Sequence, residues 1–162
     1  MTTGYLASFE PAMRLAIEQA TAAGETDVPV GAVVLDAAGV VIASASNRRE
    51  ADGDPTAHAE IVAIRGAARS LGGWRLAGCT LVVTLEPCTM CAGAVRAARL
   101  GRLVYGAADA RAGAAGSLRD VLHDRGLGPD VEVIGGVLAA ECTALLRAFF
   151  ERLRDSGDGD DG

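Results

Sequence analysis

Apolar and polar residues follow two different periods along this chain. Short continuous apolar runs, several of them rich in β-branched residues, are typical of strands that are buried on both faces. Such runs predict five strands, at residues 30–35, 40–45, 80–85, 103–105 and 131–134. Residues 36–39, between the first two runs, end in Gly39 and predict a hairpin turn, so these two strands pair antiparallel.

Between the strands, apolar residues recur every three or four positions, which is typical of amphipathic helices. The first such helix follows a predicted N-cap at Ser8 and ends at Gly24, and the second follows Thr56. Pro87 suits the first turn of a third helix that runs to about residue 100. The remaining predicted helices are a short one at 118–124 and a long one at 138–154.

This order of elements, a helix, a hairpin and then alternating helices and strands, predicts the fold class. We expect an α/β fold, a three-layer α/β/α sandwich whose five-stranded mixed sheet is mostly parallel and is opened by one antiparallel hairpin. A chain of 162 residues fits one domain, which we place at residues 1–154. Aromatic residues make up only 4% of the chain, so small aliphatic side chains must fill its core.

Most of the net charge of −6 lies at one end of the chain. Residues 155–162 carry four Asp and no base, and we expect them to form a disordered acidic tail. The remainder has 17 acidic and 15 basic side chains, which argues mildly against a generic nucleic-acid binder but allows a local arginine patch. Arg96, Arg99 and Arg102 are the candidates for such a phosphate-binding stripe, with a solvated helix end as the alternative.

Cysteine usage and hydropathy indicate the compartment. We see no signal-peptide pattern at the N-terminus and no apolar stretch near the roughly 18 residues of a membrane helix. Only four Cys occur, and two of them are spaced C-x-x-C, which indicates a metal or redox site in a reducing compartment rather than a disulfide framework. We therefore expect a cytoplasmic protein with no membrane partner.

The chemistry is concentrated in two motifs, H-x-E and P-C-x-x-C, each at the start of a predicted helix. Cys88 and Cys91 share one helix face, and the helix N-terminus favours their thiolates. With the His58 imidazole they make three zinc ligands and leave a fourth tetrahedral position for water, which is the ligand count of a catalytic site. Glu60 then lies beside the open position as a proton carrier. The combined pattern is the signature of zinc-dependent nucleobase deaminases.

The likeness extends beyond the metal motifs. From about Phe9 to Phe150 the sequence resembles the bacterial tRNA-specific adenosine deaminases, which belong to the cytidine/deoxycytidylate deaminase superfamily and have a cytidine-deaminase-like fold. The stretches that carry the resemblance are VPVGAV at 28–33, DPTAHAE at 54–60, VTLEPCTMC at 83–91 and DARAGAAGS at 109–117. The last stretch lies outside the metal motifs, and cytosine and guanine deaminases do not share it in this form.

The resemblance implies a reaction and further roles. The family converts adenosine to inosine at the wobble position of a tRNA anticodon with one Zn²⁺ per subunit, using a water activated by the zinc, and it works as a homodimer. Applied to this chain, it implies that Glu60 is the proton shuttle and that Asn47 contacts the target nucleoside. Asp109 would contact a ribose of the bound loop. Phe149, with its neighbour Phe150, would lie near the anticodon stem-loop.

Two other functions remain as alternatives. A small-molecule guanine or cytosine deaminase of nucleobase salvage would use the same zinc chemistry without an RNA partner. The acidic charge balance favours this alternative, whereas the stretch at 109–117 favours the tRNA enzyme more strongly. A purely structural zinc is the third reading, and it gives no role to Glu60.

Overall fold

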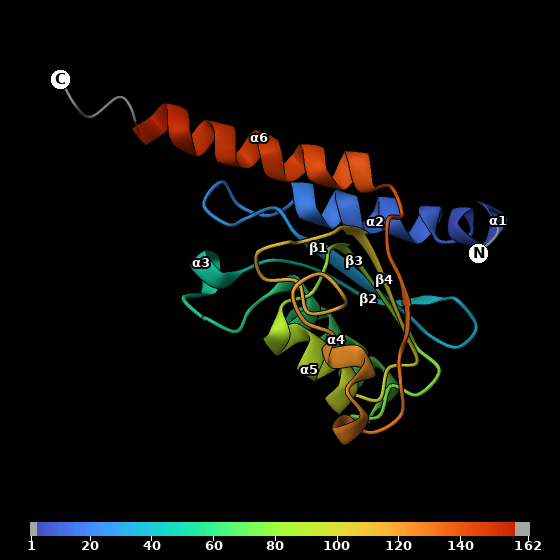
Figure 1. The fold of residues 1–162 in the computed structure, drawn as a ribbon. Coiled ribbons are helices and arrows are strands. Elements are labelled where there is room, and N and C mark those ends of the chain that lie inside the picture. Colours follow the sequence, from blue (N-terminus) through green and yellow to red (C-terminus); the bar gives the residue numbers. More distant parts are fainter. Residues whose placement is uncertain (1–2, 158–162) are drawn as a thin grey trace.

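The computed structural model describes residues 3–157, and Figure 1 shows the elements in chain order. The helices are α1 (Thr3–Ala7), α2 (Glu10–Thr21), α3 (Arg49–Asp52), α4 (Ala59–Leu71), α5 (Thr89–Ala97) and α6 (Ala139–Gly157). The strands are β1 (Gly31–Leu35), β2 (Val41–Ser46), β3 (Thr80–Leu85), β4 (Arg102–Ala107) and β5 (Glu132–Ile134). Two 3₁₀ turns, η1 (Val121–His123) and η2 (Arg125–Leu127), lie between β4 and β5.

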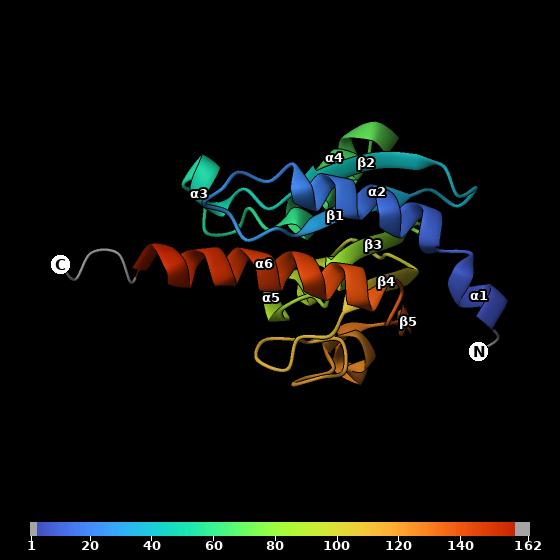
Figure 2. The ribbon, with the colours of Figure 1, turned by 90° about the horizontal axis from the view of Figure 1, so that it is seen from above.

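The elements form three layers around one mixed sheet, which confirms the predicted fold class. The strand order is β2-β1-β3-β4-β5. Helices α2 and α6 lie side by side over one face of the sheet, and α4 and α5 cover the other face (Figures 1 and 2). Each layer buries an apolar face against the sheet, which is the usual reason for this architecture.

The sheet is less parallel than the sequence predicted. The pairs β3–β4 and β4–β5 are parallel, but β1 is antiparallel to both of its neighbours, β2 and β3. The reason is that α4 carries the chain from β2 across β1 to β3, so that β2 and β3 run in the same direction on either side of β1. Two strands that run in the same direction need a long crossover connection, usually a helix, and α4 provides it between β2 and β3.

Small aliphatic residues fill the core, as the low aromatic content predicted. Most of the fully buried side chains are Ala, Val and Leu, whereas Trp74 is 57% exposed. The small side chains let helices approach the sheet closely, above all at Gly31 in β1. A Cβ atom there would lie 1.9 Å from the backbone oxygen of Ala16, so only glycine permits this contact between α2 and β1. Within residues 3–157, no helix is both long and apolar enough to cross a membrane.

The structure corrects several element boundaries. Helices α1 and α3 have four or five residues and were not predicted, because so short a segment shows no apolar period. The helix expected at 118–124 is only the 3₁₀ turn η1, which begins at Val121. Helix α6 continues to Gly157, three residues into the expected tail, and residues 158–162 lie outside the described part of the chain.

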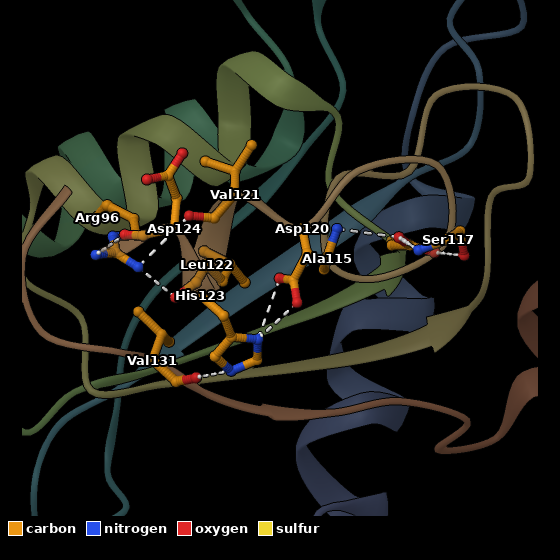
Figure 3. Close-up of polar contacts among 10 residues, drawn as sticks. Arg96, Ala115, Ser117, Asp120, Val121, Leu122, His123, Asp124 and Val131 are labelled. Carbon is orange, nitrogen blue, oxygen red and sulfur yellow. Dashed lines mark hydrogen bonds and ion pairs between the residues drawn. The ribbon is translucent and has the colours of Figure 1, made fainter. Parts of the chain in front are cut away.

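The segment between β4 and β5 is anchored by a buried arginine. Arg96 in α5 is only 4% exposed. Its guanidinium donates to five backbone carbonyls, those of Val121, Leu122, Asp124, Leu127 and Gly128. Figure 3 shows Arg96 beside the first three of these residues. The interpretation of Arg96 as part of a phosphate-binding stripe or of a solvated helix end is therefore wrong, since its donors already bind backbone. Arg102 is likewise engaged, with Glu132 at 2.8 Å.

His123 in η1 predicts a pH dependence of stability. Its Nδ1 lies 2.9 Å from an Asp120 carboxylate oxygen and its Nε2 lies 3.0 Å from the Val131 carbonyl oxygen (Figure 3). Because both ring nitrogens face acceptors, the imidazolium is favoured, and the Asp120 carboxylate raises the pKa of His123 above its usual value. The stabilisation is therefore complete below the ordinary histidine pKa and is lost as the pH rises through the raised pKa.

We expect His123→Gln to lower the free energy of unfolding at pH 5.5 by at most about 1 kcal/mol, because the ion pair is exposed. At pH 9 the difference from the parent should be smaller. Urea unfolding at both pH values measures this, and Asp120→Asn should reduce the same pH-dependent increment. A loss for His123→Gln that is equal at both pH values would exclude the imidazolium as its source.

Candidate active site

The two motif helices begin at residues that do not cap them. His58 is the N-cap residue of α4 and Cys88 is the N-cap residue of α5, and both have extended backbone conformations. Neither side chain makes a capping hydrogen bond to its own helix. The predicted cap at Thr56 was therefore wrong, as was Ser8, since Phe9 precedes α2. Both helices forgo the roughly 1 kcal/mol that a side-chain cap contributes, which leaves the two side chains free to face each other.

The strands bring these helix starts to one edge of the sheet. Because β1 runs opposite to β2 and β3, the start of β1 lies beside the ends of both, with Gly31 opposite Ser46. The end of β3 lies beside the end of β4, with Leu85 opposite Ala107. Ligands commonly bind beyond the carboxyl ends of strands in open α/β sheets, and here three such ends meet.

The three predicted metal ligands form a compact cluster. The His58 Nδ1 atom lies 3.6 Å from the Cys88 Sγ atom and 3.4 Å from the Cys91 Sγ atom, and all three ligand atoms lie within 4.8 Å of one another. Tetrahedral zinc with bonds of about 2.0–2.1 Å to nitrogen and 2.3 Å to sulfur separates such atoms by about 3.5 Å. The donor set therefore fits Zn²⁺ in both chemistry and spacing, and it leaves a fourth position for a non-protein ligand.

The pKa values of Cys88 and Cys91 are shifted in opposite directions. The Cys91 thiol and the His58 ring stabilise the Cys88 thiolate and lower the pKa of Cys88 to about 3. The adjacent Cys88 thiolate, together with burial, raises the pKa of Cys91. A bound divalent cation would favour the thiolate form of both, so zinc binding releases a proton from this pair.

Glu60 lies in the first turn of α4, and its side chain lines the same cavity as His58 and Cys88. It is only 4% exposed, and this burial raises the pKa of its carboxyl group. A raised pKa brings a carboxyl group closer to the range in which general acids and bases work. The location and the environment of Glu60 both suit a general acid and base.

The cavity has a volume of about 180 Å³, and its walls include two of the predicted substrate residues, Asn47 and Asp109. Asn47 follows β2, and its Nδ2 donates to the Val28 carbonyl oxygen at 3.1 Å. Asp109 follows β4, and its Oδ1 accepts from the backbone N–H groups of Arg111 and Ala112 at 2.9 and 3.2 Å. Each of these two cavity-lining residues thus has its side chain held in place by neighbouring backbone.

Phe149 is not among the residues that line the cavity. It lies in α6, on the opposite face of the sheet from α4 and α5 (Figure 1), and it is 4% exposed. Its ring packs edge-on against that of Phe150, which is 46% exposed, with the ring centroids 5.3 Å apart. Only the second ring of this pair is accessible to a large ligand.

Sequence reasoning missed two polar residues of the cavity wall, Arg49 and Glu86. Arg49 is exposed at the start of α3, and nothing in the sequence distinguished it from other loop arginines. Glu86 is 2% exposed, and burial opposes its ionisation. Four hydrogen-bond donors outweigh that effect and lower the pKa of Glu86. A carboxylate directly after an apolar strand is the signal that would have found it.

A His-Cys-Cys cluster beside a buried glutamate, at the strand ends of a mixed sheet, defines the class of zinc-dependent deaminases. Comparison with known families supports this class directly. Residues 7–107 match the family model described as the cytidine and deoxycytidylate deaminase zinc-binding region. The matched range includes His58, Glu60 and both ligand cysteines.

Individual relatives narrow the class. A tRNA-specific adenosine deaminase of Haemophilus influenzae is 46% identical over 90% of this chain and 85% of its own length. A solved structure from a study of A-to-I editing by tRNA:A34 deaminases has a TM-score of 0.79 and 44% identity, over 83% of this chain and 97% of its own. The chain belongs to the cytidine and deoxycytidylate deaminase family, among the tRNA-specific adenosine deaminases.

The chain is also similar to proteins that carry other names. A tRNA(Ile)-lysidine synthase of Deinococcus radiodurans is 52% identical over 82% of this chain, which spans only 23% of that protein's length. A guanine deaminase of Nitrosomonas europaea has a TM-score of 0.72 with 28% identity, over 86% of this chain and 83% of its own. The fold is thus shared with a protein described as a guanine deaminase.

Proposed function

We propose that this protein deaminates adenosine to inosine at the wobble position of a tRNA anticodon. The observation that carries the proposal is the similarity to the Haemophilus tRNA-specific adenosine deaminase. It covers 149 residues, whereas the zinc-binding region alone covers only residues 7–107. The guanine deaminase structure shares the same fold at a markedly lower identity. The proposal therefore places this chain with the tRNA enzymes rather than with the salvage enzymes.

The residues of the cavity have distinct roles in this reaction. His58, Cys88 and Cys91 would hold a zinc ion, which when bound would lower the pKa of water to about 7 and so make that water easier to deprotonate. Glu60 takes a proton from the attacking water and delivers it to N1 of adenine, which makes C6 electrophilic. After attack at C6, Glu60 takes the remaining proton from the new C6 hydroxyl and passes it to the amino group, which leaves as ammonia while the C6 carbonyl forms.

The walls of the cavity orient and select the nucleoside. Asn47 contacts the target base, and Asp109 accepts a hydrogen bond from a ribose 2′-hydroxyl with the carboxylate oxygen that its own loop leaves free. The cavity lies at the edge of the sheet, so a base must leave its stack to enter it. A hairpin loop presents such a splayed base, whereas a continuous duplex does not.

We propose that the enzyme works as a homodimer in the cytoplasm, with Phe149 and Phe150 near the anticodon stem. The described residues include four free cysteines and no disulfide, which fits a reducing compartment. Sedimentation of the purified protein tests the dimer. A molar mass of one chain at micromolar concentration would contradict it.

The proposed function is tested by incubating the purified protein with an anticodon stem-loop that carries a wobble adenosine. Free guanine and free cytosine serve as parallel substrates. We expect inosine in the RNA and no loss of either free base. Turnover of guanine or cytosine with no inosine in the RNA would assign the enzyme to nucleobase salvage instead.

Asp109 predicts a preference for RNA over DNA. We expect Asp109→Ala to lower the ratio of the deamination rates of an RNA stem-loop and its DNA counterpart, because the 2′-hydroxyl distinguishes the two. Asp124→Ala is a matched control, since Asp124 also accepts from a nearby backbone N–H group, that of Gly126 at 2.9 Å, but does not line the cavity. An unchanged ratio in Asp109→Ala would show that Asp109 does not contact the ribose 2′-hydroxyl.

A further inference from the structure

Glu86 is a buried carboxylate to which the reaction as described gives no role. It follows β3 directly and precedes Pro87, and its side chain is 2% exposed. Among the described residues, its hydrogen-bond partners include no Arg or His. An unpaired buried carboxylate is costly unless hydrogen-bond donors surround it. The donors that surround the Glu86 carboxylate show which segment of the chain it holds in place.

All of these donors come from one loop, residues 109–117. The Glu86 Oε1 atom accepts from the backbone N–H of Asp109 at 3.1 Å and from the hydroxyl of Ser117. The Oε2 atom accepts from the backbone N–H groups of Ala115 and Ser117, at 3.0 and 3.1 Å. The carboxylate therefore ties the first and the last residues of this loop to the end of β3.

The loop is closed tightly around the carboxylate. At Gly113, a Cβ atom would lie 2.4 Å from both the Glu86 Oε2 atom and the backbone oxygen of Asp109. Neither atom is the far end of a freely moving chain, because both are hydrogen-bonded within the loop. Only glycine fits at position 113 while Glu86 keeps its donors.

The carboxylate has no capacity left for a substrate. An ionised carboxyl group offers about four acceptor sites on its two oxygens, and the loop fills four. Glu86 lines the cavity, but any hydrogen bond from a substrate would have to displace one from the loop. Its influence on the reaction therefore passes through the residues it holds, and of these Asp109 is the one that also lines the cavity.

We propose that Glu86 is a positioning residue that fixes the loop 109–117 so that Asp109 faces the bound nucleoside. The role of Asp109 in this statement rests on the proposed function, whereas the ordering of the loop does not. Fixing a loop before binding removes the entropy cost of ordering it with the substrate. Loss of Glu86 should therefore raise the KM for the RNA stem-loop and leave the proton transfers by Glu60, and with them kcat, nearly unchanged.

Glu86→Gln tests the proposal, because the amide keeps the size of the side chain but replaces one acceptor oxygen with a donor. Zinc content should stay at that of the parent. Hydrogen exchange at the amides of Asp109, Ala115 and Ser117 should accelerate at least about tenfold, since each loses or weakens its acceptor. Unchanged exchange would overturn the positioning role, whatever the enzyme's substrate proves to be.

Kinetics then separate positioning from general stability. We expect Glu86→Gln to raise the KM for the stem-loop about tenfold with kcat within about threefold of the parent. Leu103→Ala, in the buried centre of β4, is the matched destabilised control and should leave KM unchanged. An equal rise of KM in Leu103→Ala would show that Glu86 acts through stability alone.

A double variant decides whether the effect passes through Asp109. If Glu86 acts by positioning Asp109, then adding Glu86→Gln to Asp109→Ala should raise KM no further, because the interaction is already lost. Independent, multiplying effects would overturn this part of the proposal. Ser117→Ala removes one of the four donors and should raise KM by a smaller factor, which keeps the test open if Glu86→Gln folds poorly.

Discussion

Glu60→Ala is expected to retain zinc and the fold but to lose turnover by at least about 10²–10⁴-fold, the usual contribution of a general acid or base. The side chain lines the cavity beside the metal ligands without being one of them, so its removal leaves the three ligand atoms in place. Glu60 transfers more than one proton in the proposed reaction, which favours the upper end of this range. Single-turnover rates on a stem-loop, together with zinc analysis of the same sample, measure both quantities.

Two further variants complete this experiment. Glu60→Gln keeps the shape of the side chain but cannot carry the proton, so it should be as slow as Glu60→Ala. Glu141→Ala removes an exposed glutamate from the first turn of α6 and should turn over like the parent. Single-turnover rates of Glu60→Ala close to those of the parent would end the role of Glu60 as proton carrier.

Cys88→Ala is expected to lose most of its zinc. Changes to groups that only support a metal ligand already cost 10–100-fold in affinity, so removal of a ligand should exceed about 100-fold. The site connects α4 to α5, and zinc that binds only the folded chain stabilises it by about 4 kcal/mol when free zinc is 1,000 times its Kd. For a domain of this size, that loss corresponds to a fall in Tm of about 10 °C.

Cys79→Ala is the matched control for this prediction. Cys79 is buried, whereas Cys88 is half-buried, and Cys79 lies outside the cluster of possible metal ligands. It should keep about one zinc per chain and lose only the packing of a small side chain. Elemental analysis and thermal unfolding of both variants provide the comparison. Undiminished zinc in Cys88→Ala would refute the ligand assignment.

The parts of the fold that local burial determines could be predicted from the sequence. The strand at 80–85 was predicted to the residue, because a continuous apolar run requires a strand buried on both faces. The metal ligands were predicted because their spacing along the chain already places each at a helix start. The N-caps were not, since His58 and Cys88 hold cap positions without capping. At these two positions, residues suited to binding a metal stand where Ser, Thr, Asp or Asn would cap the helix better.

The contacts between segments that are far apart in the sequence could not be predicted from the periodicity of apolar residues. The pairing of β1 with β3 depends on a crossover path, and no residue of either strand encodes it locally. Arg96 had the sequence context of a surface arginine, yet its carbonyl partners come from residues 25 to 32 positions away. Glu86 is similar, since its donors lie 23 to 31 positions along the chain. Such side chains are recognised only when the backbone that surrounds them is known.

The antiparallel pairing of β1 with β3 joins two segments that lie far apart along the chain. The hairpin of β1 and β2 closes across a short turn, whereas Ala32 and Val83 pair across about 50 residues, a far larger loss of chain entropy. His58 belongs to the segment that this long-range pairing closes, and Cys88 follows 30 residues later. On the ribosome, the imidazole therefore emerges well before either thiol. Metal capture therefore cannot precede the synthesis of β3, and because β4 and β5 come later in the chain, it does not by itself require a completed sheet.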